Sequence, residues 1–267
     1  MNNPIFLCVD RNPLGAFDEL VGAIAGLGFA GIEWFEVNED APWTNPVCAP
    51  VLRRLMRQHE LTAQYHAPYE ASFDLAVKED AWRTPEEIAG VVSQALARAE
   101  ALGARLMTLH LGTCPKDADR SEGLRRVAEG VRRALPEAAR RGIRLALENH
   151  TPTVLEGPLG DRPEEMDWIM AALQSEWIGR TLDLGHAHIH GHLDAFLARS
   201  LDRVLNLHLH DNHGETDEHL PLGAGDVPWD RVLRQVARAP YNGPITLEFL
   251  AEPEQYEQAI ELIRSCN

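Results

Sequence analysis

The chain has 267 residues, of which 45% are hydrophobic, so it holds enough apolar material for one large domain with its own core. Its 41 acidic and 25 basic residues give a net charge of −16, which disfavours nucleic-acid binding because such binding depends on cations that neutralise phosphates. We find no apolar run long enough to span a membrane, and the first residues, MNNPIFLCVDRNP, lack the pattern of a secretory signal.

The cysteines are widely spaced and form no CxxC pair, which favours reduced thiols over a disulfide framework. They are Cys8, Cys48, Cys114 and Cys266. We therefore expect a cytoplasmic protein that does not contact a membrane, and the sequence leaves its oligomeric state open.

Short apolar runs alternate with longer amphipathic ones along the whole chain. The expected strands lie at residues 5–9, 31–36, 61–68, 104–112, 143–150, 178–186, 203–212 and 243–250. The expected helices lie at 17–28, 48–60, 84–103, 121–142, 162–174, near 192–201, 228–239 and 253–265. The third helix has clear limits, with Thr84 as N-cap, Pro85 in the first turn and Gly103 at its end.

A strict strand–helix alternation implies parallel strands joined by right-handed crossovers. Eight such units in a chain of this length predict an α/β fold, a (β/α)₈ TIM barrel, in a single domain over residues 1–267. The alternative is an open doubly wound sheet.

Polar side chains end six successive strands of this predicted barrel, where a barrel interior normally carries Val, Ile and Leu. They are His66, His110, Glu148, Asp183 with His186 just after it, His208 and Glu248. Each alone could be a hydrogen-bonded rim residue. Together they converge on one rim, and unpaired carboxylates there would repel one another unless a divalent cation were bound.

The expected ligands combine imidazole nitrogen with carboxylate oxygen and include no thiolate, which favours Zn²⁺ or Mn²⁺ over Ca²⁺. The set exceeds the needs of one ion, so we expect one to three divalent ions. Asp217 and His219 stand two residues apart and point the same way in an extended chain. With His186 they would form a third site. The alternative is a solvated acidic loop.

Seven short motifs in this order resemble the xylose isomerase-like TIM barrel superfamily, which includes sugar and sugar-phosphate isomerases and epimerases and the endonuclease IV group (AP endonuclease family 2). The motifs are HAPYEASFDLA (66–76), LHLG (109–112), LENH (147–150), DLGH (183–186), HLHDN (208–212), DEHLPLGAGDVPW (217–229) and LEF (247–249).

The resemblance implies two ligand patterns. In the isomerase and epimerase branch, one metal is held at positions matching Glu148, Asp183, His208 and Glu248. In the endonuclease IV branch, three zinc ions have nine ligands, and all nine have counterparts in this chain. The nine are His66, His110, Glu148, Asp183, His186, His208, Asp217, His219 and Glu248.

The segment EWFEVNEDAPW (33–43) separates the branches, because we expect its carboxylates Glu33, Glu36, Glu39 and Asp40 to repel a phosphate backbone. We therefore expect a metal-dependent isomerase or epimerase that moves a proton next to the carbonyl of a small sugar or sugar phosphate, through a metal-stabilised enediolate. Its catalytic acid and base would be Glu148 and Glu248, and His186 would bind a third metal or donate to a substrate oxygen.

Two other functions stay open: an endonuclease IV-like, zinc-dependent phosphoester hydrolase acting on abasic-site DNA or a small phosphoester, and a metal-binding module without catalysis. Few basic residues could hold a substrate phosphate at the active rim: Arg11, Lys78, Arg83, Lys116, Arg120 and Arg162. We interpret His188, His190 and His192 as a solvated helix entry.

Overall fold

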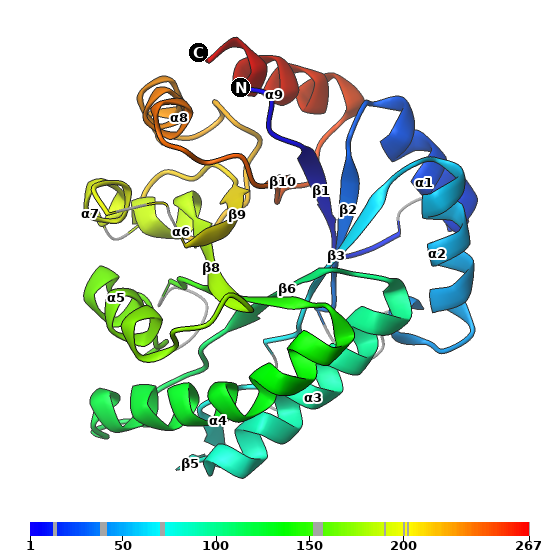
Figure 1. Ribbon diagram of the computed structural model, residues 1–267. Helices are drawn as coiled ribbons and strands as arrows, with labels where there is room; N and C mark the ends of the chain where they lie inside the picture. The colour runs from blue at the N-terminus through cyan, green and yellow to red at the C-terminus, as the bar shows by residue number, and fades with distance from the viewer. Residues whose placement is uncertain are drawn as a thin grey trace.

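The computed structural model of the protein describes residues 1–12, 15–37, 42–69, 73–151, 157–189, 191–199, 201 and 203–266, without the side chain of Thr44. Eight parallel strands close into a barrel in the order β1-β10-β9-β8-β7-β6-β3-β2, with helices packed around it (Figure 1). The predicted (β/α)₈ barrel is confirmed. The termini lie side by side, since the ammonium of Met1 donates to the carbonyl of Cys266 at 2.8 Å.

The barrel strands fall inside the eight predicted ranges. They are β1 (Ile5–Val9), β2 (Gly31–Phe35), β3 (Thr62–His66), β6 (Leu106–His110), β7 (Arg144–Glu148), β8 (Ile178–Asp183), β9 (Val204–Leu209) and β10 (Ile245–Leu247). The helices are α1 (Phe17–Gly26), α2 (Cys48–Gln58), α3 (Pro85–Leu102), α4 (Arg120–Arg141), α5 (Pro163–Ala172), α6 (Leu184–Ile189), α7 (Leu193–Leu197), α8 (Trp229–Arg238) and α9 (Pro253–Ser265).

Three elements were not predicted: a short hairpin of β4 (Val77–Lys78) and β5 (Ala81–Trp82), the 3₁₀ turn η1 (Pro42–Thr44), and helix α6. The strand predicted to reach residue 186 is therefore wrong at its end. The chain turns into α6 directly after Asp183, whose Oδ1 accepts a hydrogen bond from the backbone N–H of His186 at 2.6 Å. Such a bond satisfies a free N–H of the first helical turn.

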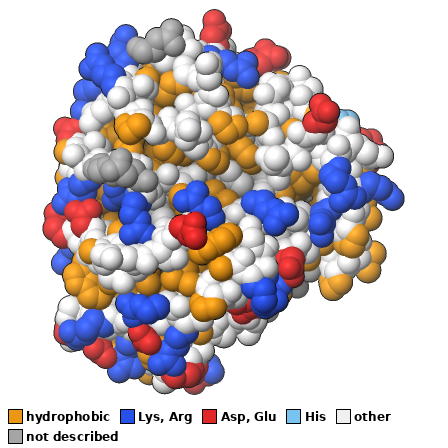
Figure 2. Space-filling view, in the orientation of Figure 1, with side chains coloured by type: hydrophobic (Ala, Val, Ile, Leu, Met, Phe, Trp, Pro, Cys, Tyr) orange, Lys and Arg blue, Asp and Glu red, His pale blue; other side chains and the backbone are white. Residues whose placement is uncertain are grey.

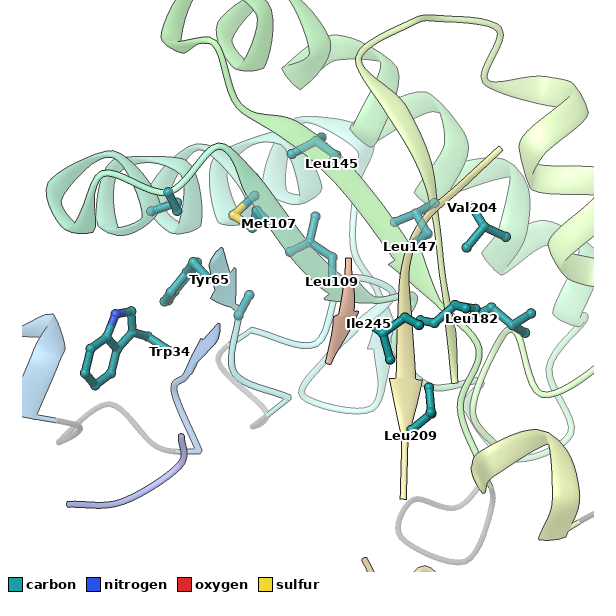
Figure 3. Packing of buried hydrophobic residues seen from close by; sticks show 14 of the residues in the cluster. Trp34, Tyr65, Met107, Leu109, Leu145, Leu147, Leu182, Val204, Leu209 and Ile245 are labelled. Carbon is teal, nitrogen blue, oxygen red and sulfur yellow. The ribbon is translucent and has the colours of Figure 1, made fainter. Parts of the chain in front are cut away.

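Alternation along the strands separates two environments. One face is apolar and packs against the helices, as Figure 3 shows for Trp34, Tyr65, Leu145 and their neighbours. Nε1 of Trp34, for example, lies 3.2 Å from the sulfur of Met56 on α2. The other face fills the barrel with a fully buried polar layer: Glu33, Gln64, Thr108, Thr181, Asn206 and Thr246.

The four cysteines are free thiols, as predicted. In the described parts of the chain, no helix is both long and apolar enough to cross a membrane.

Candidate metal centre

Side chains from several strand ends meet at one mouth of the barrel, with Glu148 between them. Oε2 of Glu148 lies 2.8 Å from Nε2 of His110 and 3.0 Å from Nε2 of His66. Its other oxygen, Oε1, lies 2.8 Å from Nδ1 of His208. The strand register explains one of these contacts, because His110 and Glu148 stand side by side on β6 and β7. One carboxylate thus links three imidazoles, a position that suits a bridge between two cations.

Donor atoms that lie within 4.8 Å of one another form four sets among the described residues, three of which share members. The inner group is His66, His110 and Glu148, and the central group is Glu148, Asp183, His208 and Glu248. The loop group is His186, His210, Asp217 and His219. The fourth set joins Glu33 to His66 and His208.

The central group fits a metal ion, because its donor atoms lack hydrogen-bond partners among the described residues. Nδ1 of His208 lies 2.8 Å from both Glu148 Oε1 and Glu248 Oε2, and 3.8 Å from Asp183 Oδ2. All four of these atoms are buried and unpaired. Buried polar atoms are normally paired, so one nitrogen and three oxygens aimed at one point suit a divalent cation with mixed N and O ligands.

The pKa shifts within the central group also indicate that it can bind a cation. Burial raises the pKa of Glu148, but the charges of His208, His110 and His66 lower it more, so the net shift is well downward. Burial lowers the pKa of His208, while Glu248, Glu33 and Glu148 raise it to well above its ordinary value. Without a cation, the carboxylates therefore depend on protonated imidazoles for neutralisation. A metal ion would replace those protons.

A cavity of about 590 Å³ opens above the groups. Its lining includes Phe35, Tyr69 and Phe249 on apolar walls, with five histidines, Asp217 and Glu248 among its polar residues. A second cavity, of about 540 Å³, lies at the opposite ends of the strands, has several arginines in its lining and contains no histidine. Figure 2 shows a face rich in hydrophobic and basic side chains on which histidine is almost absent, so the histidine-lined cavity does not open there.

The structure brings together all nine residues that the sequence picked out, in three groups that share Glu148 or lie next to one another. Two histidines were missed. His210 belongs to the loop group, and the ring of His150 lies between those of His110 and His186, with centroid distances of 4.2 and 5.0 Å. Alternation could have found both, because each stands two residues after a predicted site residue at a strand end.

Other predictions for this rim have mixed outcomes. His188 lies on α6 and His192 precedes α7, outside every donor set, while His190 lies outside the described residues. Of the six candidate phosphate-binding residues, only Arg11 lines the cavity. Arg120, for example, binds Glu165 and Asp161 instead, at 2.7 and 2.6 Å.

The predicted acidic surface after the second strand is wrong for two of its four residues. Glu33 is fully buried inside the barrel, where its Oε1 lies 2.8 Å from Nε2 of His208. Glu36 is also fully buried and bonds to Tyr65 and Arg98. Neither carboxylate can face a phosphate backbone. Glu39 and Asp40 lie outside the described residues.

Comparisons with known proteins agree with this architecture. The chain is 27% identical over 220 residues to the uncharacterized protein MJ1311 of Methanocaldococcus jannaschii, covering 80% of this chain and 73% of that one. It superimposes on a D-tagatose 3-epimerase-like protein with a TM-score of 0.80 at 23% identity, over 98% and 96% of the two chains. For endonuclease IV from Thermus thermophilus the TM-score is 0.68 at 23% identity, over 98% of each chain.

The sequence pattern of one family, described as Xylose isomerase-like TIM barrel, matches residues 21–266, almost the whole chain. The chain therefore belongs to the xylose isomerase-like TIM barrel family.

Proposed function

We propose that the protein is a metal-dependent isomerase or epimerase of a small, unphosphorylated sugar. The observation that carries this proposal is the central group, whose four unpaired donor atoms converge beneath a cavity of about 590 Å³. One structural neighbour, a D-tagatose 3-epimerase-like protein, has a name that agrees with this class of reaction. A bound divalent ion would polarise the carbonyl and hydroxyl oxygens of the sugar and stabilise the negative charge that develops there.

Glu148 and Glu248 have different roles in this proposal. Glu248 lines the cavity and is 7% exposed, so it can reach a substrate carbon, and we assign it the removal of the proton next to the carbonyl. Glu148 is 1% exposed beneath three imidazoles, which makes it primarily a ligand. In this proposal Glu148 transfers a proton at the opposite face of the sugar once a substrate is bound. His186 lines the same cavity and is assigned to the loop group.

The charge around the cavity favours a neutral sugar over a sugar phosphate. Arg11 is the one Lys or Arg among the described lining residues, and its guanidinium lies 3.7 Å from the carboxylate of Asp10. The segments outside the described ranges contain no Lys or Arg. Asp10, Asp217, Glu218 and Glu248 add negative charge to the lining. Apart from the metal ion itself, the lining therefore offers a phosphate dianion little positive charge.

Solvent exchange tests the proposal. The metal-loaded protein is incubated in D₂O with a panel of ketoses, with and without phosphate, and deuterium at the carbon next to the carbonyl is followed by NMR. We expect exchange with at least one unphosphorylated ketose. In protein saturated with metal, Glu248→Gln should reduce it by at least about 100-fold, a loss typical of a general base. Glu148→Gln should lose both exchange and metal.

Glu218→Gln is the matched control. Glu218 also lines the cavity, but it pairs with His213 at 2.9 Å and belongs to none of the donor sets. This variant should exchange at the wild-type rate. Exchange that persists in Glu248→Gln at the wild-type rate would exclude Glu248 as the base, and no exchange with any ketose would exclude the isomerase proposal.

A second function has one observation in its favour. The inner, central and loop groups together reproduce the nine-residue pattern that the sequence shares with the endonuclease IV branch. Clustered metal ions can activate water for phosphoester hydrolysis. Cleavage of abasic-site DNA or of a small phosphomonoester, at a rate that falls steeply with salt for the DNA, would favour this function over sugar isomerisation.

A further inference from the structure

His210 is a buried histidine whose Nε2 lies 3.2 Å from Oδ1 of Asp183 without forming a hydrogen bond to it. It is fully inaccessible to solvent, and neither ring nitrogen makes a hydrogen bond to any described residue. Its Nε2 lies 3.6 Å from Oδ1 of Asp217, and its ring stacks on that of His219 at 4.0 Å. A buried imidazole left unpaired is costly, so the site requires an occupant that accepts its nitrogen lone pair.

The other two histidines of the loop group are already oriented for a ligand. Nδ1 of His186 donates to the carbonyl of Asn149 at 3.0 Å, and Nδ1 of His219 donates to the carbonyl of Glu248 at 2.6 Å. Both bonds leave Nε2, which faces Asp217, as the ring nitrogen that can bind a metal ion. Backbone carbonyls that fix the tautomer in this way are typical of the outer shell of metal-binding histidines.

The spacing of the donor atoms fits a tetrahedral ion. Nε2 of His186 lies 3.3 Å from Asp217 Oδ2, while Nε2 of His219 and His210 lie 3.2 and 3.6 Å from Asp217 Oδ1. Ligands held at about 2.0–2.2 Å from a tetrahedral Zn²⁺ stand about 3.3–3.6 Å from one another. The donor atoms of all four residues lie within 4.8 Å of one another, so side-chain rotations could bring them onto one ion.

We propose that His210 is the fourth protein ligand of a closed structural metal site, formed by the loop group and best suited to Zn²⁺. Three imidazoles and one carboxylate fill the four positions of a tetrahedral ion, so no position is left for a phosphate or sugar oxygen. The ion joins α6 and the end of β9 to the loop that carries Asp217 and His219. This proposal rests on metal binding alone and does not depend on the sugar reaction.

Local structure supports a rigid closed site. His219 has φ of +48°, a left-handed conformation that a non-glycine residue keeps only when its surroundings hold it there. Gly185 provides the space for the imidazole, because a Cβ at this position would lie 2.2 Å from Cε1 of His210. Asp211, which follows His210 in the chain, anchors the loop that carries Asp217 and His219. Its carboxylate accepts hydrogen bonds from the N–H of Gly223 at 2.8 Å and from Nε1 of Trp229 at 2.9 Å.

Metal content and Co²⁺ spectroscopy test the proposal without any turnover assay. The wild-type protein is loaded with Zn²⁺ and then exposed to a chelator. One equivalent of Zn²⁺, bound at the loop group, should be released more slowly than the rest. The same site, reloaded with Co²⁺, should show the intense visible absorption of a four-coordinate ion. His210→Ala should lower the affinity for this equivalent by more than about 100-fold, beyond the roughly 10–100-fold typical of an outer-shell partner.

Two further variants sharpen the test. Gly185→Ala leaves His210 in the chain but fills the space of its ring, so it should lose the same equivalent. His188→Ala is the matched control, because His188 lies on α6 outside every donor set and should leave both the affinity and the spectrum unchanged.

Two results would overturn the inference. In the first, His210→Ala still releases one equivalent of metal ion as slowly as the wild type does, and its Co²⁺ spectrum is unchanged. In the second, the variant weakens only the central group, which would mean that His210 orients Asp183, whose Oδ1 lies 3.2 Å from its Nε2. A protein that shows the predicted metal behaviour but no exchange with any ketose would refute the proposed function and leave the closed site intact.

Discussion

At the scale of single residues, the barrel places a carboxylate behind the fully buried His208. Oε1 of Glu33 lies 2.8 Å from Nε2 of His208, and Oε2 accepts a hydrogen bond from Asn206 at 2.8 Å. Asn206 accepts in turn from the hydroxyl of Thr246 at 2.9 Å. This chain of contacts leaves Nδ1 of His208 as its donor atom toward the central group. A carboxylate in this position orients a ligating imidazole and increases its basicity.

Glu33→Gln should therefore weaken metal binding at the central group by about 10–100-fold while the fold is retained. Titration of the metal-free protein with Zn²⁺ against a competing chelator measures the change. Glu36→Gln is the control, because Glu36 is an equally buried glutamate that pairs with Arg98 and Tyr65 instead. The control should lower the free energy of unfolding but not the metal affinity, and equal affinities for Glu33→Gln and wild type would contradict the prediction.

Prediction of site residues from the sequence succeeded where a polar residue ends a strand. It failed for polar residues in the middle of a strand, where only alternation shows which face they occupy. His66, His110, Glu148 and Glu248 stand out because apolar residues precede them. Glu33 was expected to repel a phosphate backbone at the surface, although Ile32 and Trp34 on either side are fully buried on the opposite face of the strand. The pairing of donor atoms between strands depends on barrel closure, which no local pattern encodes.

At the scale of elements, capping residues and hydrophobic spacing predicted helices better than strand ends. The predicted limits of α3 agree with the structure, where Thr84 accepts from the N–H of Glu87 at 3.2 Å and Gly103 has φ of +80°. The start of α6 was not predictable in this way, because Asp183 and Leu184 continue the polar–apolar alternation of β8. The helix begins there because Asp183 caps it from a position fixed by the barrel.

Two exposed changes in α3 should shift stability in opposite directions. Thr84→Ala removes the capping box and should lower the free energy of unfolding by about 1 kcal/mol. Gly90→Ala should raise it by about 0.5–1 kcal/mol, because this glycine lies in the helix interior with open space around its Cα. Urea denaturation at constant metal concentration compares them, and shifts of the same sign in both variants would contradict this account of α3.

At the scale of the whole molecule, the barrel encloses more negative charge than its own basic side chains neutralise. The central and loop groups and Glu33 bring several buried carboxylates together, while a number of arginines pair with glutamates on the outer helices, as Arg126 does with Glu122 at 2.6 Å. Imidazoles are the main positive partners inside. The folded state therefore requires either protons on these histidines or metal ions between them.

This requirement predicts opposite pH dependences for the metal-free and metal-loaded proteins. Burial lowers the pKa of His219, but bonding to Asp217 and the charge of Glu248 raise it to about 9. The pKa values of His186 and His208 also shift well upward. A histidine whose pKa is raised on folding stabilises the protein below its unfolded pKa of about 6.5, and this contribution is lost as the pH rises through the folded value.

The metal-free protein should thus lose stability between about pH 6.5 and 9, by about 1.4 kcal/mol per pH unit for each such histidine. Below about pH 4.5 it should lose stability again, because the pKa values of Asp217, Glu148 and Glu248 are lowered on folding. In the presence of metal, the ligands bind the ion only after losing their protons, so affinity and stability should rise over the same interval from pH 6.5 to 9. Denaturant titrations across this interval, with chelator or with a fixed free Zn²⁺ concentration, measure both slopes. Parallel slopes under the two conditions would mean that the histidines at the barrel mouth do not exchange protons for metal.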